Sequence, residues 1–329
     1  MILVLILAIS LIANVVFSRY FRGGASGMVH QPETLSMTSL QLPAGGHSGQ
    51  GPRIAQINLT GIISGDSQRG RPSMVAETQA AFSQALADPL IKAIVLRIDS
   101  PGGEVTASDS LYQTVKEADT HKPVIALMDS MAASGGYYIA CGARRIIAHP
   151  TTWTGSIGVI VQTLGYAPLL DKVGLKMRVF KSGAFKDATS GHREMTPEEE
   201  KYLQGIVMQT YDRFVGIVSQ SRGISVDQLK SGVADGRIVT GTDALAQKLV
   251  DQLGYASDAW QLARDEAGIT DAEVVEYGRS PGLISALGLL GQAAANTGTQ
   301  RLEIDLSDRL LPGLQAGRVY LLPQFMSGE

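Results

Sequence analysis

Short apolar runs that alternate with helical segments constrain the fold of this chain more than any other feature. From residue 53 onward, runs such as KAIVLRID and PVIALMD have the length and the apolar character of buried strands. Strands that alternate with helices predict an α/β fold around a mainly parallel sheet. We expect strands at residues 53–63, 92–99, 123–129, 144–150, 155–162 and 176–180, and helices at residues 74–86, 106–119, 135–143, 166–174, 196–223, 226–231 and 241–249.

Composition narrows the classes of function. The 329 residues allow one large domain or two modest ones, and the net charge of -3 gives no reason to expect nucleic acid as a partner. Cys141 is the single cysteine, so no intrachain disulfide can form. The chain has no Walker loop and no GxGxxG, CxxC or HExxH motif, so we expect neither a bound cofactor nor a metal.

The first residues, MILVLILAISLIANVVF, are long and apolar enough for a spanning helix. They lack the basic start and the small-residue exit of a cleaved signal peptide. We expect a transmembrane signal anchor at residues 1–18, a flexible linker at residues 19–52 and one globular domain at residues 53–329. A cleaved signal or a packed apolar helix is the alternative. Arg19 and Arg22 favour a cytoplasmic carboxyl side.

Four polar, glycine-rich motifs lie at strand exits or in loops. They are IDSPGGEV (residues 98–105), DSMAASGGYY (residues 129–138), TGSIGV (residues 154–159) and KSGAFKDATSGHREMT (residues 181–196). The Pro-Gly-Gly turn leaves backbone N–H groups open to an oxyanion, although an ordinary strand-to-helix turn has the same sequence. The TGSIGV serine also fits a simple turn, and the last motif also fits a solvated surface loop.

Ser134 follows a strand and begins a helix. The amino terminus of a helix stabilises developing negative charge, and the N–H of Gly135 would point toward the oxygen formed when Ser134 attacks a carbonyl. The alternative is that Ser134 only caps the helix. A nucleophilic serine also needs a base. His149 and His192 are possible, and so is a lysine whose pKa falls from about 10.4 toward 7–8. The residue pattern alone does not choose among them.

Together the four motifs and the later stretch ADGRIVTGTDALAQKLVDQLGY resemble the signal peptide peptidase A (protease IV) family of Ser–Lys peptidases, in its short single-repeat branch. The resemblance runs from about residue 53 to the end. It implies that Ser134 is the nucleophile and Lys186 the general base. It also implies that Ser156 hydrogen-bonds the lysine, and that Gly103 and Gly135 form the oxyanion hole.

The resemblance also implies a Clp/crotonase-type superhelical core with parallel strands and flanking helices. The family degrades remnant signal peptides outside the bacterial cytoplasmic membrane. We therefore expect a single-pass membrane serine endopeptidase with an extracytoplasmic catalytic domain, although Arg19 and Arg22 favour the opposite orientation. Glu104 stands where short relatives often have a third glycine, which could alter the substrate-binding edge.

In the long branch of that family, the serine and lysine of one site come from different repeats. This chain resembles a single repeat, so we expect a ring-like homo-oligomer in which Lys186 of one protomer serves Ser134 of a neighbour. Three rival functions remain: an inactive peptide-binding membrane scaffold, a Clp-like Ser-His-Asp peptidase, and acyl-CoA chemistry on the same fold.

Overall fold

The computed structural model describes residues 35–41, 51–67, 72–278 and 320–321. The expected anchor at residues 1–18 lies outside these ranges. Within them, no helix combines the length and apolar character needed to cross a membrane.

A nine-stranded sheet forms the centre of the described part. Its main path runs β1 (Ser36–Gln41), β10 (Glu273–Gly278), β2 (Arg53–Thr60), β3 (Ile91–Ser100), β5 (Val124–Ala133), β6 (Arg145–Ala148) and β9 (Gln252–Leu253). β7 (Trp153–Gly155) continues the sheet beside the end of β5 and pairs with β8 (Ile238–Thr240). The central pairs are parallel, which confirms the predicted mixed α/β fold with a parallel sheet.

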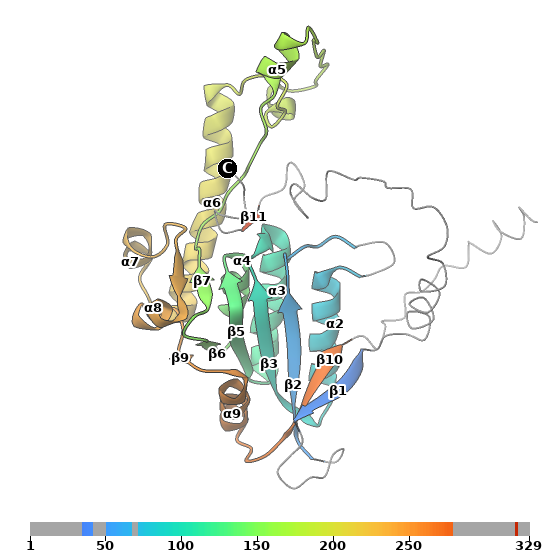
Figure 1. Cartoon of the computed structure of the whole chain (residues 1–329), viewed down its shortest axis with the longest axis vertical. Helices are drawn as coiled ribbons and strands as arrows, with labels where there is room; N and C mark the ends of the chain where they lie inside the picture. Colours follow the sequence, from blue (N-terminus) through green and yellow to red (C-terminus); the bar gives the residue numbers. More distant parts are fainter. Residues whose placement is uncertain (1–34, 42–50, 68–71, 279–319, 322–329) are drawn as a thin grey trace, which may run out of the picture. The chain divides into compact units, whose positions relative to one another are not determined.

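Helices cover both faces of this sheet (Figure 1). α2 (Met74–Ala87), α3 (Val105–His121) and α4 (Gly135–Ala140) pack on one face, and α9 (Ala256–Ala267) packs on the other. The period of two along β3 explains this arrangement, since Ile94 and Leu96 join the first core while Ala93 and Val95 join the second. Two short helices, α7 (Val226–Ser231) and α8 (Gly241–Ala246), flank β8.

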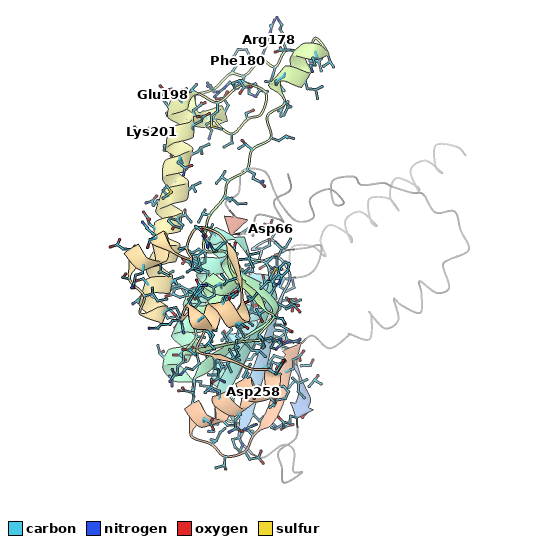
Figure 2. The ribbon with its side chains drawn as sticks, turned by 60° about the vertical axis from the view of Figure 1, so that its left-hand side comes forward. Asp66, Arg178, Phe180, Glu198, Lys201 and Asp258 are labelled. Carbon is cyan, nitrogen blue, oxygen red and sulfur yellow. The ribbon has the colours of Figure 1, made fainter. Side chains whose placement is uncertain are left out.

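An arm extends from this body between β7 and α6 (Pro197–Arg222). It carries α5 (Ala167–Lys172) and the 3-10 helix η1 (Ala184–Asp187), and it returns along α6. Figure 2 shows Arg178 and Phe180 near the tip, with Glu198 and Lys201 at the start of α6 close by. The second half of α6 packs into the body through Phe214, Val215, Ile217 and Val218.

Two expected strands are wrong. The run at residues 155–162 is not a strand, because Gly155 (φ 74°) and Ser156 (φ 50°) are both left-handed and end the extended backbone of β7. The run at residues 176–180 is irregular and exposed on the arm, and Phe180 is 96% exposed. In the described part of the chain, residues 176–180 pair with no strand.

Part of the expected linker is ordered. β1 lies within residues 19–52 and pairs antiparallel with β10, a strand that we had not expected. Its sequence, SMTSLQ, has few apolar residues because most of its side chains are exposed. The composition of this segment is therefore that of a linker, whereas its backbone pairs with β10 and makes it part of the sheet.

Candidate active site

Ser134 lies in the sharp turn between β5 and α4. Its φ of 52° and ψ of -113° lie outside the common regions for a residue with a side chain. Two backbone bonds hold this conformation: the Ser134 N–H donates to the Gly155 carbonyl at 2.8 Å, and the Ser134 carbonyl accepts the Tyr138 N–H at 2.8 Å. Strained backbone of this kind clusters at functional sites.

The Ser134 hydroxyl is buried and makes no hydrogen bond within the described part of the chain. It does not cap α4, so the capping interpretation of this serine is wrong. An unsatisfied buried polar group costs about 1–3 kcal/mol. The Ser134 hydroxyl can therefore form a hydrogen bond with a group from outside the described residues.

Glycines bring a second backbone segment against the start of α4. A Cβ on Gly135 would lie 2.5 Å from the Ser108 Oγ and 3.2 Å from the Gly103 nitrogen. A Cβ on Gly103 would lie 2.0 Å from the Ile63 carbonyl oxygen. β4 (Gly103–Glu104) can therefore lie this close to Ile63 and to the start of α4 only because both positions are glycine.

Two backbone N–H groups near Ser134 can donate to an oxyanion. Ile63 donates to the Gly102 carbonyl at 2.8 Å and accepts from the Glu104 N–H at 2.9 Å. Since N–H directions alternate along an extended segment, the Gly103 N–H points away from Ile63. Gly135 is the first residue of α4, where an N–H has no partner within the helix. Both N–H groups are therefore candidate donors to an oxyanion formed near Ser134.

One side of β4 lies against Ile63, and the other side carries another strand. β11 (Tyr320–Leu321) pairs with it antiparallel, with Leu321 opposite Gly103 and Tyr320 opposite Glu104. An extended backbone can therefore lie beside the proposed oxyanion donors. This is the mode in which a peptide adds to an exposed sheet edge.

Ser156 lies beside Ser134. β7 runs parallel to β5 with Ala133 opposite Gly155, so the two serines leave adjacent strands at the same level. Ser156 is 2% exposed, and its N–H donates to the Arg237 carbonyl at 2.7 Å. The structure thus brings Ser134, Ser156, Gly103 and Gly135 together.

Lys186 is exposed and lies on the arm, in η1. The ring of the preceding residue, Phe185, packs on Tyr202 with centroids 5.2 Å apart. Farther along α6, Arg213 donates to the Tyr138 hydroxyl of α4 at 3.2 Å. Tyr202 and Arg213 are about three turns apart, roughly 17 Å along the helix axis. Within one protomer, the structure does not bring Lys186 to Ser134.

The two candidate histidines have other neighbours. His149 Nδ1 lies 3.6 Å from Asp129 Oδ1, and the His149 ring packs against Tyr255. His192 lies on the arm, with Nε2 3.9 Å from Asp187 Oδ2. Neither histidine hydrogen-bonds the Ser134 hydroxyl.

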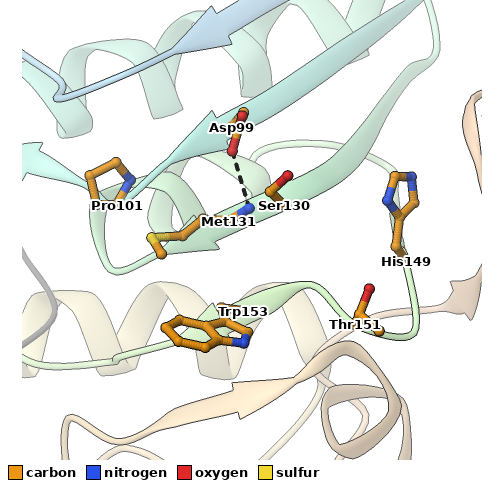
Figure 3. A pocket seen from close by; sticks show the side chains of 7 residues that line it. All are labelled: Asp99, Pro101, Ser130, Met131, His149, Thr151 and Trp153. Carbon is orange, nitrogen blue, oxygen red and sulfur yellow. Dashed lines mark hydrogen bonds between the residues drawn. The ribbon is translucent and has the colours of Figure 1, made fainter.

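Sequence analysis missed a cavity next to the strands that lead to the two serines (Figure 3). It encloses about 570 Å³ and is lined by Asp99, Pro101, Ser130, Met131, His149, Thr151 and Trp153. The Met131 N–H donates to Asp99 Oδ1 at 3.2 Å, which joins β3 to β5 where both approach the site. No single motif marks this cavity, because its walls come from three separate segments of the chain.

Comparisons with known proteins agree with this architecture. A family model described as peptidase family S49 matches residues 116–270, and one described as Clp protease matches residues 75–154. A signal peptide peptidase SppA of Enterococcus faecium is 37% identical over 232 residues, which cover 68% of this chain and 67% of that protein. A protease of Synechocystis sp. is 40% identical over 224 residues, which cover 68% and 77%. Protease 4 of Salmonella typhi is 34% identical over 247 residues, which cover 74% of this chain and 38% of that protein.

Proposed function

Since the chain belongs to peptidase family S49, we propose that it is a membrane-anchored serine endopeptidase that cleaves signal peptides and other apolar peptides with a Ser–Lys dyad. The observation that carries this proposal is the buried hydroxyl of Ser134, which has no hydrogen-bond partner among the described residues and lies near Gly103 and Gly135. A nucleophile next to two oxyanion donors is the arrangement that acyl transfer requires.

In the proposed reaction, the neutral amine of Lys186 takes the proton of the Ser134 hydroxyl as the oxygen attacks the peptide carbonyl. The N–H groups of Gly103 and Gly135 stabilise the resulting oxyanion. The lysine then gives its proton to the departing amine, and a water molecule activated by the same lysine hydrolyses the acyl-enzyme. Ser156 accepts or donates a hydrogen bond that orients the lysine.

The pairing of β11 with β4 supports a peptide substrate. A substrate in the same place would run antiparallel to Gly103–Glu104 and present its backbone to the oxyanion donors. Main-chain pairing depends little on side-chain identity, so such an edge suits the varied sequences of signal peptides.

The arm supports an assembly of several copies. Lys186 is exposed in a single protomer, whereas a lysine base needs a site that favours the neutral amine, which burial provides. The arm also exposes many apolar side chains, among them Leu164, Leu169, Val173, Leu175, Met177 and Phe180. Apolar surface of this kind marks an interaction site. A neighbouring protomer that covers the arm would bury Lys186 against its own Ser134, in a ring-like homo-oligomer.

We place this assembly at the bacterial cytoplasmic membrane. The apolar stretch at residues 1–17 would anchor each chain, with the catalytic domain on the extracytoplasmic side. Long domains can cross against the bias of Arg19 and Arg22.

The test is digestion of a synthetic signal peptide by the full chain and by Ser134→Ala and Lys186→Ala. Both variants should lose cleavage and keep the fold, while Lys230→Ala on the body should match the wild type. The pH–rate curve should rise toward alkaline pH, because the lysine must be neutral to accept a proton. Wild-type activity in either site variant would refute the dyad. A curve controlled near pH 6.5 would favour a histidine base.

A non-catalytic scaffold would bind the peptide and leave it intact. Labelling of the wild type, but not of Ser134→Ala, by a fluorophosphonate would exclude that alternative. The scaffold should show no such difference.

A further inference from the structure

Charged side chains surround the turn that carries Lys186. Asp187, the next residue, accepts hydrogen bonds at its Oδ1 from Lys181 Nζ at 2.6 Å and from Arg193 Nη2 at 2.6 Å. Arg193 Nε also donates to Asp187 Oδ2 at 3.2 Å. The Asp187 side chain is 11% exposed, so these bonds form in a largely enclosed place.

Arg193 also donates hydrogen bonds to a second carboxylate, that of Glu199. Its Nη1 donates to Glu199 Oε2 at 2.8 Å, and its Nη2 donates to Glu199 Oε1 at 2.6 Å. Two-pronged pairs of this kind fix geometry as well as adding energy.

Glu199 is itself fixed to the start of α6. The Thr196 N–H donates to Glu199 Oε2 at 2.9 Å, and the Glu199 N–H donates to Thr196 Oγ1 at 3.3 Å. This capping box satisfies two helix-initial N–H groups. An unbroken set of hydrogen bonds therefore connects a long helix, through Glu199, Arg193 and Asp187, to the turn of Lys186.

The charges in this set cancel. Asp187 and Glu199 are negative, and Lys181 and Arg193 are positive. Hydrogen bonds from Arg193 and then Lys181 hold the pKa of Asp187 well below its usual range. Hydrogen bonds from Arg193 and then from the Thr196 backbone lower the pKa of Glu199 to about 2. The neighbouring titratable groups are His192, 10% exposed, the exposed Glu194 beside Arg193, and the exposed Glu198, Glu200 and Lys201 at the start of α6.

We propose that Arg193 is the positioning residue of the general base: it ties the turn of Lys186 to α6 and compensates the carboxylate of Asp187. This proposal rests on the assignment of Lys186 as the base. An uncompensated carboxylate next to a lysine favours the ammonium form, which cannot accept a proton. Arg193 therefore affects both the position of Lys186 and the fraction of Lys186 that is in the neutral form.

The experiment compares full-length wild type with Arg193→Gln, Arg193→Lys and Glu199→Gln in cleavage of a synthetic signal peptide at low ionic strength. Arg193→Gln leaves a net negative charge, so the midpoint of the kcat/KM–pH curve should rise and kcat should fall about tenfold or more at little change in KM. Glu199→Gln leaves a net positive charge, so its midpoint should fall. Gln at this position can still complete the capping box.

Arg193→Lys keeps the positive charge but loses the guanidinium group that bonds two carboxylates. Its kcat should therefore fall while the midpoint of its kcat/KM–pH curve stays unchanged. Lys230→Gln is the matched control, because it removes an exposed ion pair with Asp212 on the body (2.7 Å) and should change neither quantity. Midpoints of Arg193→Gln and Glu199→Gln that do not move in opposite directions would overturn the proposal. If Arg193→Gln does not fold, a Glu199→Gln midpoint that does not fall, or a wild-type kcat for Arg193→Lys, would overturn the proposal.

Failure of this proposal differs from failure of the proposed function. If Lys186→Ala is inactive while Arg193→Gln has the wild-type kcat and midpoint, only the role of Arg193 is refuted. If Lys186→Ala keeps wild-type activity, the base itself is wrongly assigned.

Discussion

Ser134 and Ser156 are two of the three non-glycine residues with positive φ in the described part of the chain; the third, Lys248, follows α8. Both serines have a glycine neighbour and leave the carboxyl ends of adjacent parallel strands. The motifs marked these positions, because glycine beside a serine at a strand exit indicates a tight turn. They could not indicate that the Ser134 hydroxyl is buried without a partner, which depends on packing from α3 and β4.

Gly135 offers a direct test of this packing. We expect Gly135→Ala to destabilise the fold by about 1–3 kcal/mol, since overpacking has this cost. It should also lower kcat/KM, because the new methyl group would lie 2.5 Å from Ser108 Oγ and 3.2 Å from the Gly103 nitrogen. Gly216→Ala is the control: apart from its chain neighbours and the nearby backbone of α6, no described atom lies within 4 Å of its Cβ position, so it should stabilise by about 0.5–1 kcal/mol. Urea denaturation of both variants measures the free energy of unfolding, which should fall for Gly135→Ala and rise for Gly216→Ala.

Ser156→Ala should reduce activity less than Lys186→Ala does. Removal of a general base costs about 10²–10⁴-fold, whereas orienting the base contributes only part of that effect. Steady-state kcat of both variants decides this. An equal loss would give Ser156 a larger role than orientation.

α6 is the element that the sequence predicted best. Thr196, Pro197 and Glu199 form the expected helix start, and the helix ends at Arg222 before Gly223 in the left-handed conformation. The expected strand at residues 155–162 failed because the left-handed Gly155 and Ser156 end β7, whereas the one at residues 176–180 failed for another reason. Periodicity reports which side chains are apolar, but it does not report whether a partner strand exists. Residues 176–180 on the arm have the apolar pattern of a strand, but they are exposed and belong to no sheet.

The link between η1 and α6 should depend on acid pH. The pKa of Glu199 is lowered from 4.5 to about 2 by Arg193. A carboxylate with a lowered pKa contributes its full stabilisation above its usual pKa and loses it as pH falls through the lowered value. We expect the link to weaken between about pH 4.5 and 2. The NMR signal of the Arg193 side-chain N–H should report this change, and Glu199→Gln should abolish the part that depends on Glu199.

At the scale of the whole molecule, the body and the arm carry different parts of the proposed site. The body holds Ser134, Ser156, Gly103 and Gly135, whereas the arm holds Lys186 and the exposed apolar side chains. The residue pattern predicted the parallel sheet from local signals. It could not predict the division of the site, because the distance between two motifs depends on the path of the arm. The expectation that Ser134 and Lys186 of one chain do not meet came only from the family resemblance.

Complementation tests whether neighbouring protomers share a site. Ser134→Ala and Lys186→Ala, mixed under conditions that exchange subunits, should regain part of the activity, because some interfaces pair an intact serine with an intact lysine. Ser134→Ala mixed with the double variant should regain none, since no interface then holds an intact serine. No recovery in the first mixture, despite demonstrated exchange, would mean that each chain builds its own site.

The unpartnered hydroxyl of Ser134 also affects how activity depends on concentration. A buried polar group left without a hydrogen bond costs about 1–3 kcal/mol, and a group that reaches it recovers this free energy. Applied to the association of two copies, that amount corresponds to about a 5–150-fold gain in equilibrium constant. If the lysine comes from a neighbour, completing the site and joining the ring favour each other. Dispersed chains would then be inert, and the activity per chain would rise with its density in the membrane.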